Sequence, residues 1–268
     1  LKKNFINFIE NTPSFGKSFI CLDDKNNRNI IKKLKTKNYN TYGVNKNANF
    51  QIKNIFQNSN FSKFDLKVTL LGAKSYLIKN IKIPTIGLHN IRNATAAIAV
   101  AVSVGISKKI ILKGLKEFKG VQRRFTKIFT FKGVTFFDDY AHHPTEIREV
   151  LNGVKNVYNN KEIICVFQPH RISRVKNLNK EFSFSFKKAD TVVLCPIYKA
   201  GENIKLGFNY INFAKSIIKN SKVNLILIKN NFDLIKYTKQ NIFGDKIVIG
   251  MGAGSVSNWI RDLPNHLK

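Results

Sequence analysis

Residues 133–146 read GVTFFDDYAHHPTE, and this stretch decides how the second half of the chain folds. An apolar run ends in two aspartates and a tyrosine, and a helical pattern of apolar residues starts just after Pro144. Polar groups between a buried strand and a helix are where open α/β sheets bind ligands. Proline at a helix start has an ordinary structural explanation, whereas adjacent histidines after adjacent aspartates do not. The stretch predicts a functional site rather than a solvated loop.

The same alternation of strand and helix continues through the second half. Buried apolar strands that alternate with helices predict a doubly wound, mostly parallel sheet of the Rossmann-like kind. The strand candidates lie at 134–138, 162–167, 190–195, 222–228 and 246–250, and the helical patterns lie near 145–157, 173–187, 209–219 and 230–240.

The first half has a mixed pattern. An alternation of apolar and polar residues between Tyr39 and Ile83 predicts several antiparallel strands. The Ala-rich stretch from His89 to Val104 is apolar nearly all round, so we expect a buried helix that Gly105 ends. Other patterns predict helices near 5–9, 30–34 and 108–118 and a strand at 18–22. We therefore expect an α/β protein with two domains, 1–120 and 121–268.

The bulk composition is that of a globular protein, with a hydrophobic fraction of 43%. No apolar run is long enough to cross a bilayer, so we expect no membrane partner. The three cysteines are far apart, and Cys165 and Cys195 lie in strand-like runs. Buried, reduced thiols in a cytoplasmic protein are the expected state.

The formal net charge of +30 raises the possibility of a nucleic-acid-binding protein. The lysines are scattered, however, without a dense basic block or regular aromatic–basic interleaving. Lys, Asn, Ile and Phe are abundant together, which is the bias of an AT-rich genome. We therefore expect no nucleic-acid partner, although the excess of positive charge favours anionic substrates.

Two further polar clusters are candidate sites. Residues 87–94, GLHNIRNA, open the Ala-rich helix; Asn90 is either a helix cap or, with His89 and Asn93, part of a polar pocket in which amides read an adenine edge. Residues 168–174, QPHRISR, follow a strand and suit a carboxylate or a phosphate.

Residues 120–125, GVQRRF, lie at the expected domain boundary. Their arginines are either solvated surface charges or groups that reach a phosphate. Residues 250–255, GMGAGS, predict a tight strand-to-helix turn with modest ligand-binding potential, because they do not fit G-x-G-x-x-G. Residues 16–18, GKS, are no P-loop: the earlier glycine is replaced by Asn11, and a strand is expected to follow.

Taken together and in this order, the clusters resemble the Mur ligases of peptidoglycan synthesis. The family carries G-x-H-N-x-x-N-A, G-x-x-R-R-F, D-D-Y-x-H-H-P-T-E, F-Q-P-H-R-x-[ST]-R, Y-x-A-G-E and a late G-A-G. The corresponding segments here are 87–94, 120–125, 138–146, 167–174, 198–202 and 252–254. The resemblance spans nearly the whole chain. It implies the C-terminal part of a central ATP-binding domain, followed by a Rossmann-like domain.

The resemblance is closest to the members that join L-alanine to UDP-N-acetylmuramate. It implies ATP as cosubstrate, an acyl phosphate formed on the lactyl carboxylate, and attack on it by the amine of L-alanine. It further implies that adenine is held by His89, Asn90 and Asn93, the ribose by Asp139 and the phosphates by Arg124. The residues that it implies face the alanine and the intermediate are His143, His170, Arg171 and Arg174.

The chain departs from the family in one respect. A complete member carries a UDP-sugar domain and a P-loop followed by magnesium ligands, and none of these occurs in this sequence. We therefore expect a piece of a ligase, inactive alone, that needs Mg²⁺ ligands from an upstream segment and holds no metal itself. A murein-peptide recycling ligase is the alternative within the family; it shares the D-D-x-A-H-H-P-T core but lacks the Q-P-H-R-x-S-R form. A basic nucleic-acid-binding Rossmann-like protein is the alternative outside it.

Overall fold

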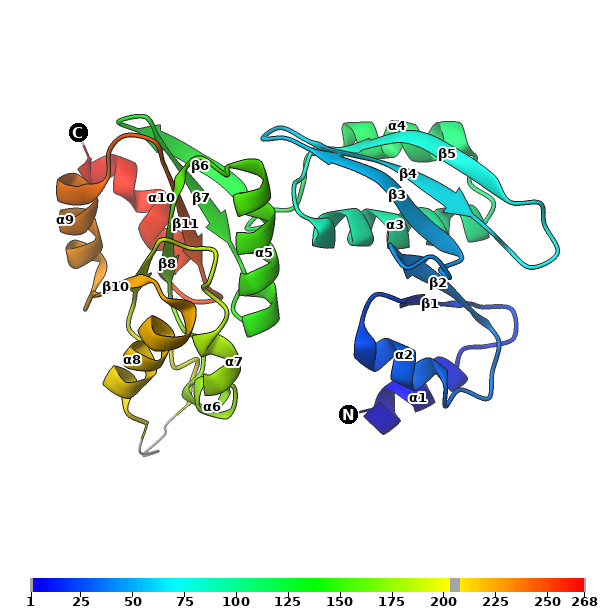
Figure 1. The fold of residues 1–268 in the computed structure, drawn as a ribbon, viewed down its shortest axis with the longest axis horizontal. Helices are drawn as coiled ribbons and strands as arrows, with labels where there is room; N and C mark the ends of the chain where they lie inside the picture. Colours follow the sequence, from blue (N-terminus) through cyan, green and yellow to red (C-terminus); the bar gives the residue numbers. More distant parts are fainter. Residues whose placement is uncertain (1, 203–207, 268) are drawn as a thin grey trace. The chain divides into compact units, whose positions relative to one another are not determined.

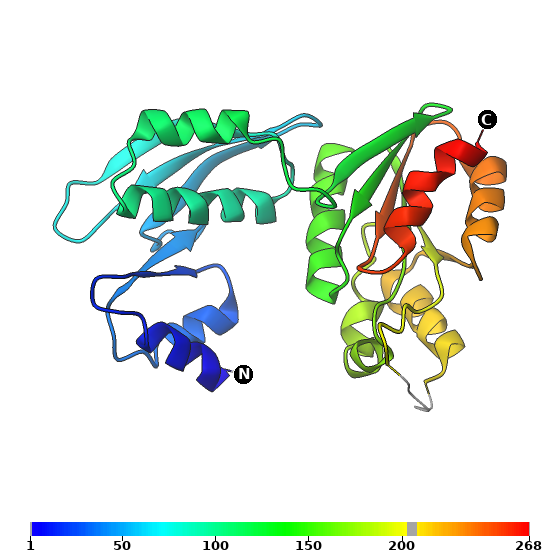
Figure 2. The same ribbon diagram turned by 180° about the vertical axis from the view of Figure 1, so that it is seen from behind.

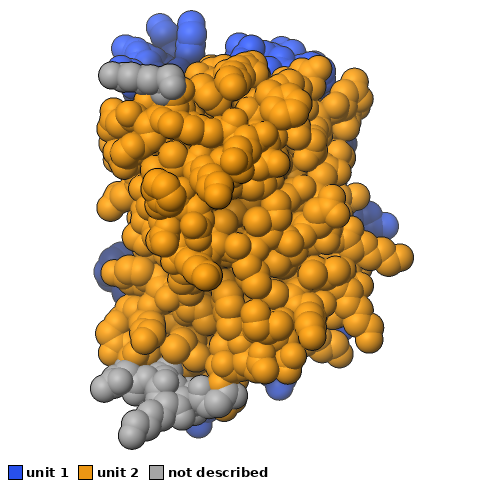
Figure 3. Space-filling model, turned by 90° about the vertical axis from the view of Figure 1, so that its left-hand side faces the viewer, with its two compact units in different colours: residues 1–119 blue, residues 120–268 orange. Residues whose placement is uncertain are grey.

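The computed structural model describes residues 2–202 and 208–267. The chain divides into unit 1, Leu1–Lys119, and unit 2, Gly120–Lys268 (Figure 3). Each unit has its own sheet and its own apolar core. No helix among the described residues is long and apolar enough to span a membrane.

Unit 1 is built on a five-stranded sheet in the order β1-β2-β3-β4-β5 (Figure 1). Helices α3 and α4 cover one face of it, where Phe50, Phe64 and Leu66 meet Ile91 and Ile98. The elements are α1 (Lys2–Glu10), β1 (Ser18–Cys21), α2 (Lys25–Ile31), β2 (Tyr39–Gly43), β3 (Phe50–Gln57), β4 (Ser62–Val68), β5 (Tyr76–Ile83), α3 (Leu88–Ser103) and α4 (Lys108–Glu117).

The prediction of antiparallel strands between Tyr39 and Ile83 was wrong for β2. This strand pairs in parallel with β1 and with the start of β3, whereas β3, β4 and β5 are antiparallel. Alternation along a strand reports which face is buried, but the connection sets the strand's direction. Here Asp23 accepts hydrogen bonds from the backbone N–H groups of Val44 and Asn45 at 3.1 and 3.0 Å, which redirects the chain after β2.

Helix α3 is buried on one face only, so the expectation of a helix buried all round was also wrong. Ile91, Thr95, Ile98 and Ala99 pack inward, whereas Val100 is 45% exposed. The pattern failed because alanine and valine satisfy an apolar template on both faces, while unit 1 supplies a sheet on one face only.

Unit 2 contains a six-stranded sheet in the order β10-β9-β8-β11-β7-β6. All neighbouring pairs are parallel except β6 and β7, which form a hairpin, so the predicted α/β class and mostly parallel sheet are confirmed. The elements are β6 (Thr126–Phe131), β7 (Val134–Asp139), α5 (Pro144–Val157), β8 (Glu162–Phe167), α6 (Ile172–Asn177), α7 (Asn179–Ser183), β9 (Thr191–Leu194), α8 (Tyr210–Ser221), β10 (Asn224–Leu227), α9 (Asn231–Asn241), β11 (Lys246–Met251) and α10 (Val256–His266).

Helices cover both faces of this sheet. Leu234 of α9 and Ile260 of α10 join the core cluster on one face, and α5, α7 and α8 lie on the other (Figures 1 and 2). Two details differ from the prediction: β6 was not predicted, and the helix expected at 173–187 is two short helices. Leu178 separates the two helices with φ −117° and ψ 23°, and α7 ends at Ser183, where the hydroxyls of Ser183 and Ser185 donate to the carbonyls of Lys180 and Glu181 and compete with helical bonding.

Candidate functional site

The topology of unit 2 brings the ends of three strands and the loops that follow them together at the carboxyl end of β11. The helices that follow β7 and β8 lie on one face of the sheet, and α10, which follows β11, lies on the other. Since β11 sits between β7 and β8, the loops after all three strands diverge around one point. In open α/β sheets, ligands bind at the point where the connecting helices switch from one face of the sheet to the other.

The β7–α5 loop is the first wall of the candidate site. His143 is the N-cap of α5, and its Nδ1 accepts a hydrogen bond from the Thr145 N–H at 3.3 Å. Glu146 Oε2 accepts in return from the backbone N–H groups of His142 and His143 at 3.0 and 3.2 Å. This capping box gives one of the two adjacent histidines the structural explanation that the sequence alone did not reveal.

His142 has a fixed ring orientation. Its Nδ1 lies 2.8 Å from the Tyr140 carbonyl oxygen and 3.6 Å from Glu146 Oε2. A carbonyl can only accept, so Nδ1 carries the proton in this contact and Nε2 is the atom left to accept one.

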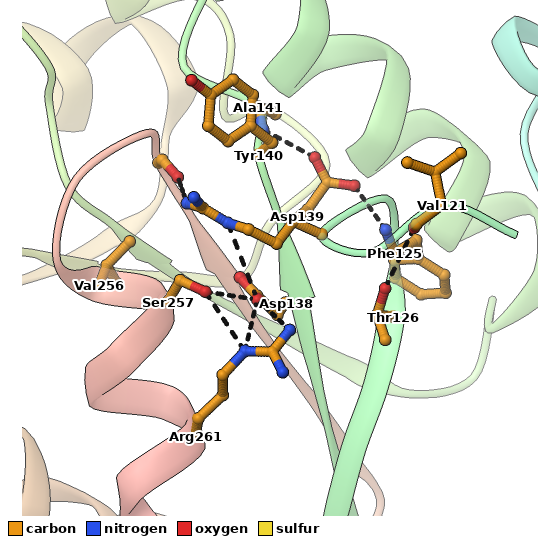
Figure 4. Close-up of polar contacts among 12 residues, drawn as sticks. Val121, Phe125, Thr126, Asp138, Asp139, Tyr140, Ala141, Val256, Ser257 and Arg261 are labelled. Carbon is orange, nitrogen blue, oxygen red and sulfur yellow. Dashed lines mark hydrogen bonds and ion pairs between the residues drawn. The ribbon is translucent and has the colours of Figure 1, made fainter.

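Asp139 closes the end of β7 and is 2% exposed. Its Oδ1 accepts from the Ala141 N–H and its Oδ2 from the Phe125 N–H, both at 2.8 Å (Figure 4). Burial raises the pKa of this carboxyl to about 6, against the lowering effect of the two backbone N–H groups and the Arg124 charge. A carboxylate oxygen accepts more than one hydrogen bond, so each oxygen retains a lone pair for a ligand hydroxyl.

The β8–α6 loop is the second wall. Arg174 Nη1 lies 3.4 Å from His170 Nδ1, and Arg171 adopts φ 68°, a strained backbone conformation of the kind that clusters at ligand sites. Burial lowers the pKa of His170, and its neighbours Arg174, His142 and Arg171 lower it further. The pKa of His143 is lowered in the same way, by burial and then by Arg174 and His142, against the raising effect of Glu146. The positive groups at this edge of the sheet therefore disfavour protonation of His143 and His170, and they favour the binding of an anion.

Residues 198–202 brace the second wall. The Tyr198 carbonyl accepts from the Arg171 N–H at 2.9 Å, and Tyr198 N–H donates to the Pro169 carbonyl at 2.8 Å. Glu202 accepts from both the backbone N–H and the hydroxyl of Ser173. The segments 167–174 and 198–202 are thus one substructure, although more than twenty residues separate them.

A row of aromatic rings joins the two walls. His142 lies 5.0 Å from Tyr140 and 5.8 Å from His170, and His170 stacks on Tyr198 at 5.5 Å between centroids. The rings come from the loops after β7, β8 and β9, so only the fold brings them together.

The glycine turn after β11 packs tightly against this row. A Cβ on Gly252 would lie 2.8 Å from the Gln168 carbonyl oxygen, and one on Gly254 would lie 2.5 Å from Gln168 Oε1 and 2.6 Å from Tyr198 Cγ. Gln168 Oε1 also accepts from the Val256 N–H at 3.0 Å, at the start of α10. The turn is therefore a close packing contact between β8, β9 and β11.

The turn at residues 121–125 adds two arginines from unit 2's first residues. The guanidinium carbons of Arg123 and Arg124 lie 4.6 and 5.9 Å from the Tyr140 ring centroid. Arg123 is half-buried and Arg124 is exposed. Of the two, Arg124 is the one whose charge is available to a ligand.

In unit 1, the three polar residues predicted to hold adenine lie on the first two turns of α3. Asn90 is inside the helix and is not its cap; its Nδ2 donates to the Ile86 carbonyl at 2.7 Å, and Gly87 occupies the cap position. His89 packs against Gly87, where a Cβ would lie 2.5 Å from the imidazole Cε1. Asn93 is exposed.

Comparison with known families accounts for both units. The Mur ligase middle domain matches residues 1–101, and the Mur ligase glutamate ligase domain matches residues 123–254. The chain belongs to the Mur ligase family. This Mur ligase chain is 64% identical, over 98% of its own length, to the UDP-N-acetylmuramate–L-alanine ligase of Pelagibacter ubique, and 34% identical to that of Caulobacter vibrioides. It spans 57% of the length of each of these relatives.

Solved structures agree with this membership. The UDP-N-acetylmuramate–alanine ligase of Thermotoga maritima superposes with a TM-score of 0.68 at 25% identity, covering 90% of this chain and 54% of that one. A murein peptide ligase of Psychrobacter arcticus has the same TM-score at 20% identity, covering 99% of this chain and 54% of that one, and shows that the fold is shared.

The structure of this Mur ligase chain groups most of the predicted site residues within unit 2. Asp139 at the end of β7, His143 at the start of α5, and His170, Arg171 and Arg174 after β8 lie at one sheet edge, with Arg124 on the turn that contacts Tyr140. The adenine candidates lie in unit 1.

Sequence reasoning missed the residues that hold this edge from behind. Asp138 is fully buried and is bonded by Ser257 and Arg261 of α10. In unit 1, sequence reasoning also missed the ion pair between Asp23 and Arg92, whose Oδ2 and Nε atoms are 2.7 Å apart. The adjacency of two aspartates was a signal that one faces the site and the other the core, because side chains alternate along a strand.

Proposed function

We propose that this chain supplies the nucleotide-binding and amino-acid-binding side of an ATP-dependent ligase that joins L-alanine to UDP-N-acetylmuramate in peptidoglycan synthesis. The observation that carries the proposal is the convergence of His143, His170, Arg171 and Arg174 at the carboxyl edge of the unit 2 sheet. The identity to ligases of this name supports the choice of substrates.

The reaction requires charge neutralisation and positioning rather than a protein nucleophile. The γ-phosphoryl group of ATP passes to the lactyl carboxylate and ADP leaves. The alanine amine then attacks the acyl carbon, the tetrahedral intermediate loses inorganic phosphate, and an amide remains. Guanidinium groups stabilise phosphoryl and carboxylate oxygens through paired, charge-assisted hydrogen bonds. Arg171 and Arg174 are proposed to face the alanine carboxylate and the intermediate.

The lowered pKa values of His143 and His170 suit this role. A neutral imidazole at physiological pH can accept a proton from the alanine ammonium before it attacks. His170 Nδ1 is near Arg174, so its Nε2 is the atom proposed to face the reacting groups.

We propose that this chain contributes residues to the binding of ATP. His89, Asn90 and Asn93 are assigned to adenine, Asp139 to the ribose and Arg124 to the phosphates. Mg²⁺ would accompany ATP and neutralise phosphate charge. No group of three or more His, Cys, Asp or Glu side chains in the described ranges is arranged to hold a metal ion, so no residue here is assigned to it. The domains 1–120 and 121–268 are then the ATP-binding and Rossmann-like parts of the ligase. We also propose a cytoplasmic location, supported by the two buried free thiols, Cys165 and Cys195.

The test is a chimera in which this chain replaces the matching 57% of the Pelagibacter ubique relative. We expect release of labelled phosphate that depends on both L-alanine and UDP-N-acetylmuramate. A folded chimera that is inactive beside an active parent would overturn the proposal, as would turnover that ignores L-alanine.

His143 allows a matched pair of variants in that chimera. Asparagine is a strong N-cap, so His143→Asn keeps the start of α5 but removes the imidazole. We expect His143→Asn to lose turnover without a fall in thermal midpoint, and Arg148→Ala, on the exposed face of α5, to retain it. Full activity of His143→Asn would show that His143 is only a cap.

A further inference from the structure

The Asp138 carboxylate is fully buried directly behind the candidate site, at the end of β7 (Figure 4). Its Oδ2 accepts from the Ser257 hydroxyl at 2.6 Å and from Nε and Nη2 of Arg261 at 3.2 and 3.0 Å. Ser257 and Arg261 are one turn apart on α10, so the first turns of this helix hold the carboxylate. Side chains alternate along a strand, so Asp138 and Asp139 point to opposite sides of β7. The Asp138 side chain faces α10 and does not reach the aromatic row.

Arg123 lies on the other side of the same carboxylate. Its Nε is 4.0 Å from Asp138 Oδ2, its Nη2 donates to the Gly252 carbonyl at 2.7 Å, and its guanidinium stacks on Tyr140. Among the described residues, Asp138 Oδ1 and Arg123 Nε are buried polar atoms without a hydrogen-bond partner. Buried polar groups are costly when incompletely paired, so the packing around them must hold this arrangement in place.

The backbone of the arginine turn is fastened at the same place. The Arg123 carbonyl accepts from the Tyr140 N–H at 2.7 Å, and the Phe125 N–H donates to Asp139 at 2.8 Å. Arg123 and Phe125 adopt φ 59° and 50°, which side chains other than glycine rarely do without support. The Phe125 ring stacks on Phe137 at 4.1 Å. Arg124 is thus an exposed residue between two strained, anchored neighbours.

We propose that Asp138, Ser257, Arg261 and Arg123 form a buried anchor that positions Arg124 at the ligand edge, with Arg123 as a positioning residue that touches no ligand. Helix α10 holds Asp138, Asp138 and the Gly252 carbonyl hold Arg123, and Arg123 sets the strained turn that presents Arg124. The hydrogen bond from Arg123 to the Gly252 carbonyl ties the glycine turn after β11 to the arginine turn beside the end of β7.

Hydrogen exchange tests the anchor without any ligand. In the full chain, Arg261→Met removes the guanidinium group that pairs with Asp138 while keeping an unbranched apolar side chain on α10. We expect the amides of Arg124, Phe125 and Tyr140 to exchange at least tenfold faster, while amides of β8 keep their protection. Arg261→Lys should restore much of the protection, and Arg148→Met should match the unchanged chain. Unchanged exchange of the turn in folded Arg261→Met would overturn the proposal.

Binding of ATP tests the positioning role, and this arm rests on the proposed function. If Arg123 acts through Arg124, Arg124→Ala and Arg123→Met should each raise the Kd for ATP by about tenfold, and the double variant should be no weaker than either. Additive losses would mean that Arg123 contacts the nucleotide itself, and would overturn its assignment as a positioning residue. These Kd values are measured in the chimera with the Pelagibacter ubique relative, and absence of ATP binding by the chimera without substitutions would count against the proposed function alone, because hydrogen exchange still decides the anchor.

Discussion

Asp139 gives the sharpest prediction of how stability depends on pH. Its pKa is raised from 3.8 to about 6, chiefly by burial. The folded chain therefore binds the proton more tightly than the unfolded chain does. The stability associated with this proton is fully present below about pH 4 and is lost as the pH rises through about 6. At about 1.4 kcal/mol per pH unit, the whole effect is about 3 kcal/mol, of which about 2 kcal/mol falls between about pH 4.5 and pH 7.5.

The assay is urea unfolding of the chain and of Asp139→Asn across this range. Asparagine keeps an acceptor for one backbone N–H but does not titrate, so it adds a cost that is independent of pH. We expect the unfolding free energy of the chain, minus that of Asp139→Asn, to fall by about 2 kcal/mol between about pH 4.5 and pH 7.5. Taking the difference removes the effect of His143 and His170, whose lowered pKa values make stability rise with pH.

The result that would refute this reasoning is a difference that stays flat or rises with pH. A rise would mean that the hydrogen bonds from Phe125 and Ala141 outweigh burial and depress the pKa of Asp139 instead. Asp245→Asn is the matched control, because the Asp245 side chain is 91% exposed and its removal changes charge without changing burial.

Three more predictions follow from close packing, charge and burial. Gly254→Ala should destabilise the chain by about 1–3 kcal/mol, because its Cβ would lie 2.5 Å from the Gln168 side-chain oxygen. Gly114→Ala on α4, where a Cβ meets nothing within 4 Å, should stabilise the chain by about 0.5–1 kcal/mol. Equal effects of the two substitutions in urea unfolding would contradict this. Inorganic phosphate should raise the pKa of His170 in an NMR titration, since an anion offsets the neighbouring positive charges that now lower it; an unmoved pKa would mean that no anion binds beside this ring. Cys165 and Cys195 are fully buried and burial raises their thiol pKa values, so a thiol reagent should label them only after unfolding; fast labelling of the native chain would show that this core opens.

The regular part of unit 2 could be predicted from the sequence because each strand there is a short apolar run between helical patterns. Strand β8, predicted at 162–167, occupies those residues. Strand β6 escaped prediction because it is an edge strand, paired only with β7, without a fully buried residue and with a bulge between Lys127 and Phe129 that interrupts the alternation. In unit 1 the alternation correctly indicated strands but carried no information on their direction.

The candidate site, like the fold, could be predicted from the sequence only in part. The density of histidines, arginines and aspartates after strands marked the loops that form it. The sequence did not show which member of each pair belongs to the candidate site: Asp138 and Asp139 are equivalent in the sequence, yet Asp138 is held by α10, and Asp139 accepts a hydrogen bond from the arginine turn. His143 likewise proved to be the N-cap of α5, which a pattern of residue types alone did not show.

The sequence by itself determined the class of fold, the strand ends that carry polar groups and the family to which they point, because apolar periodicity and long motifs are local properties of the chain. Only the tertiary structure decided the order β8-β11-β7, the ring row from Tyr140 to Tyr198 and the anchor between Asp138 and α10. These depend on contacts between residues about thirty to more than a hundred positions apart. Such contacts form only when the sheet brings the carboxyl ends of its parallel strands to one edge and buries a charge that must then find its partners.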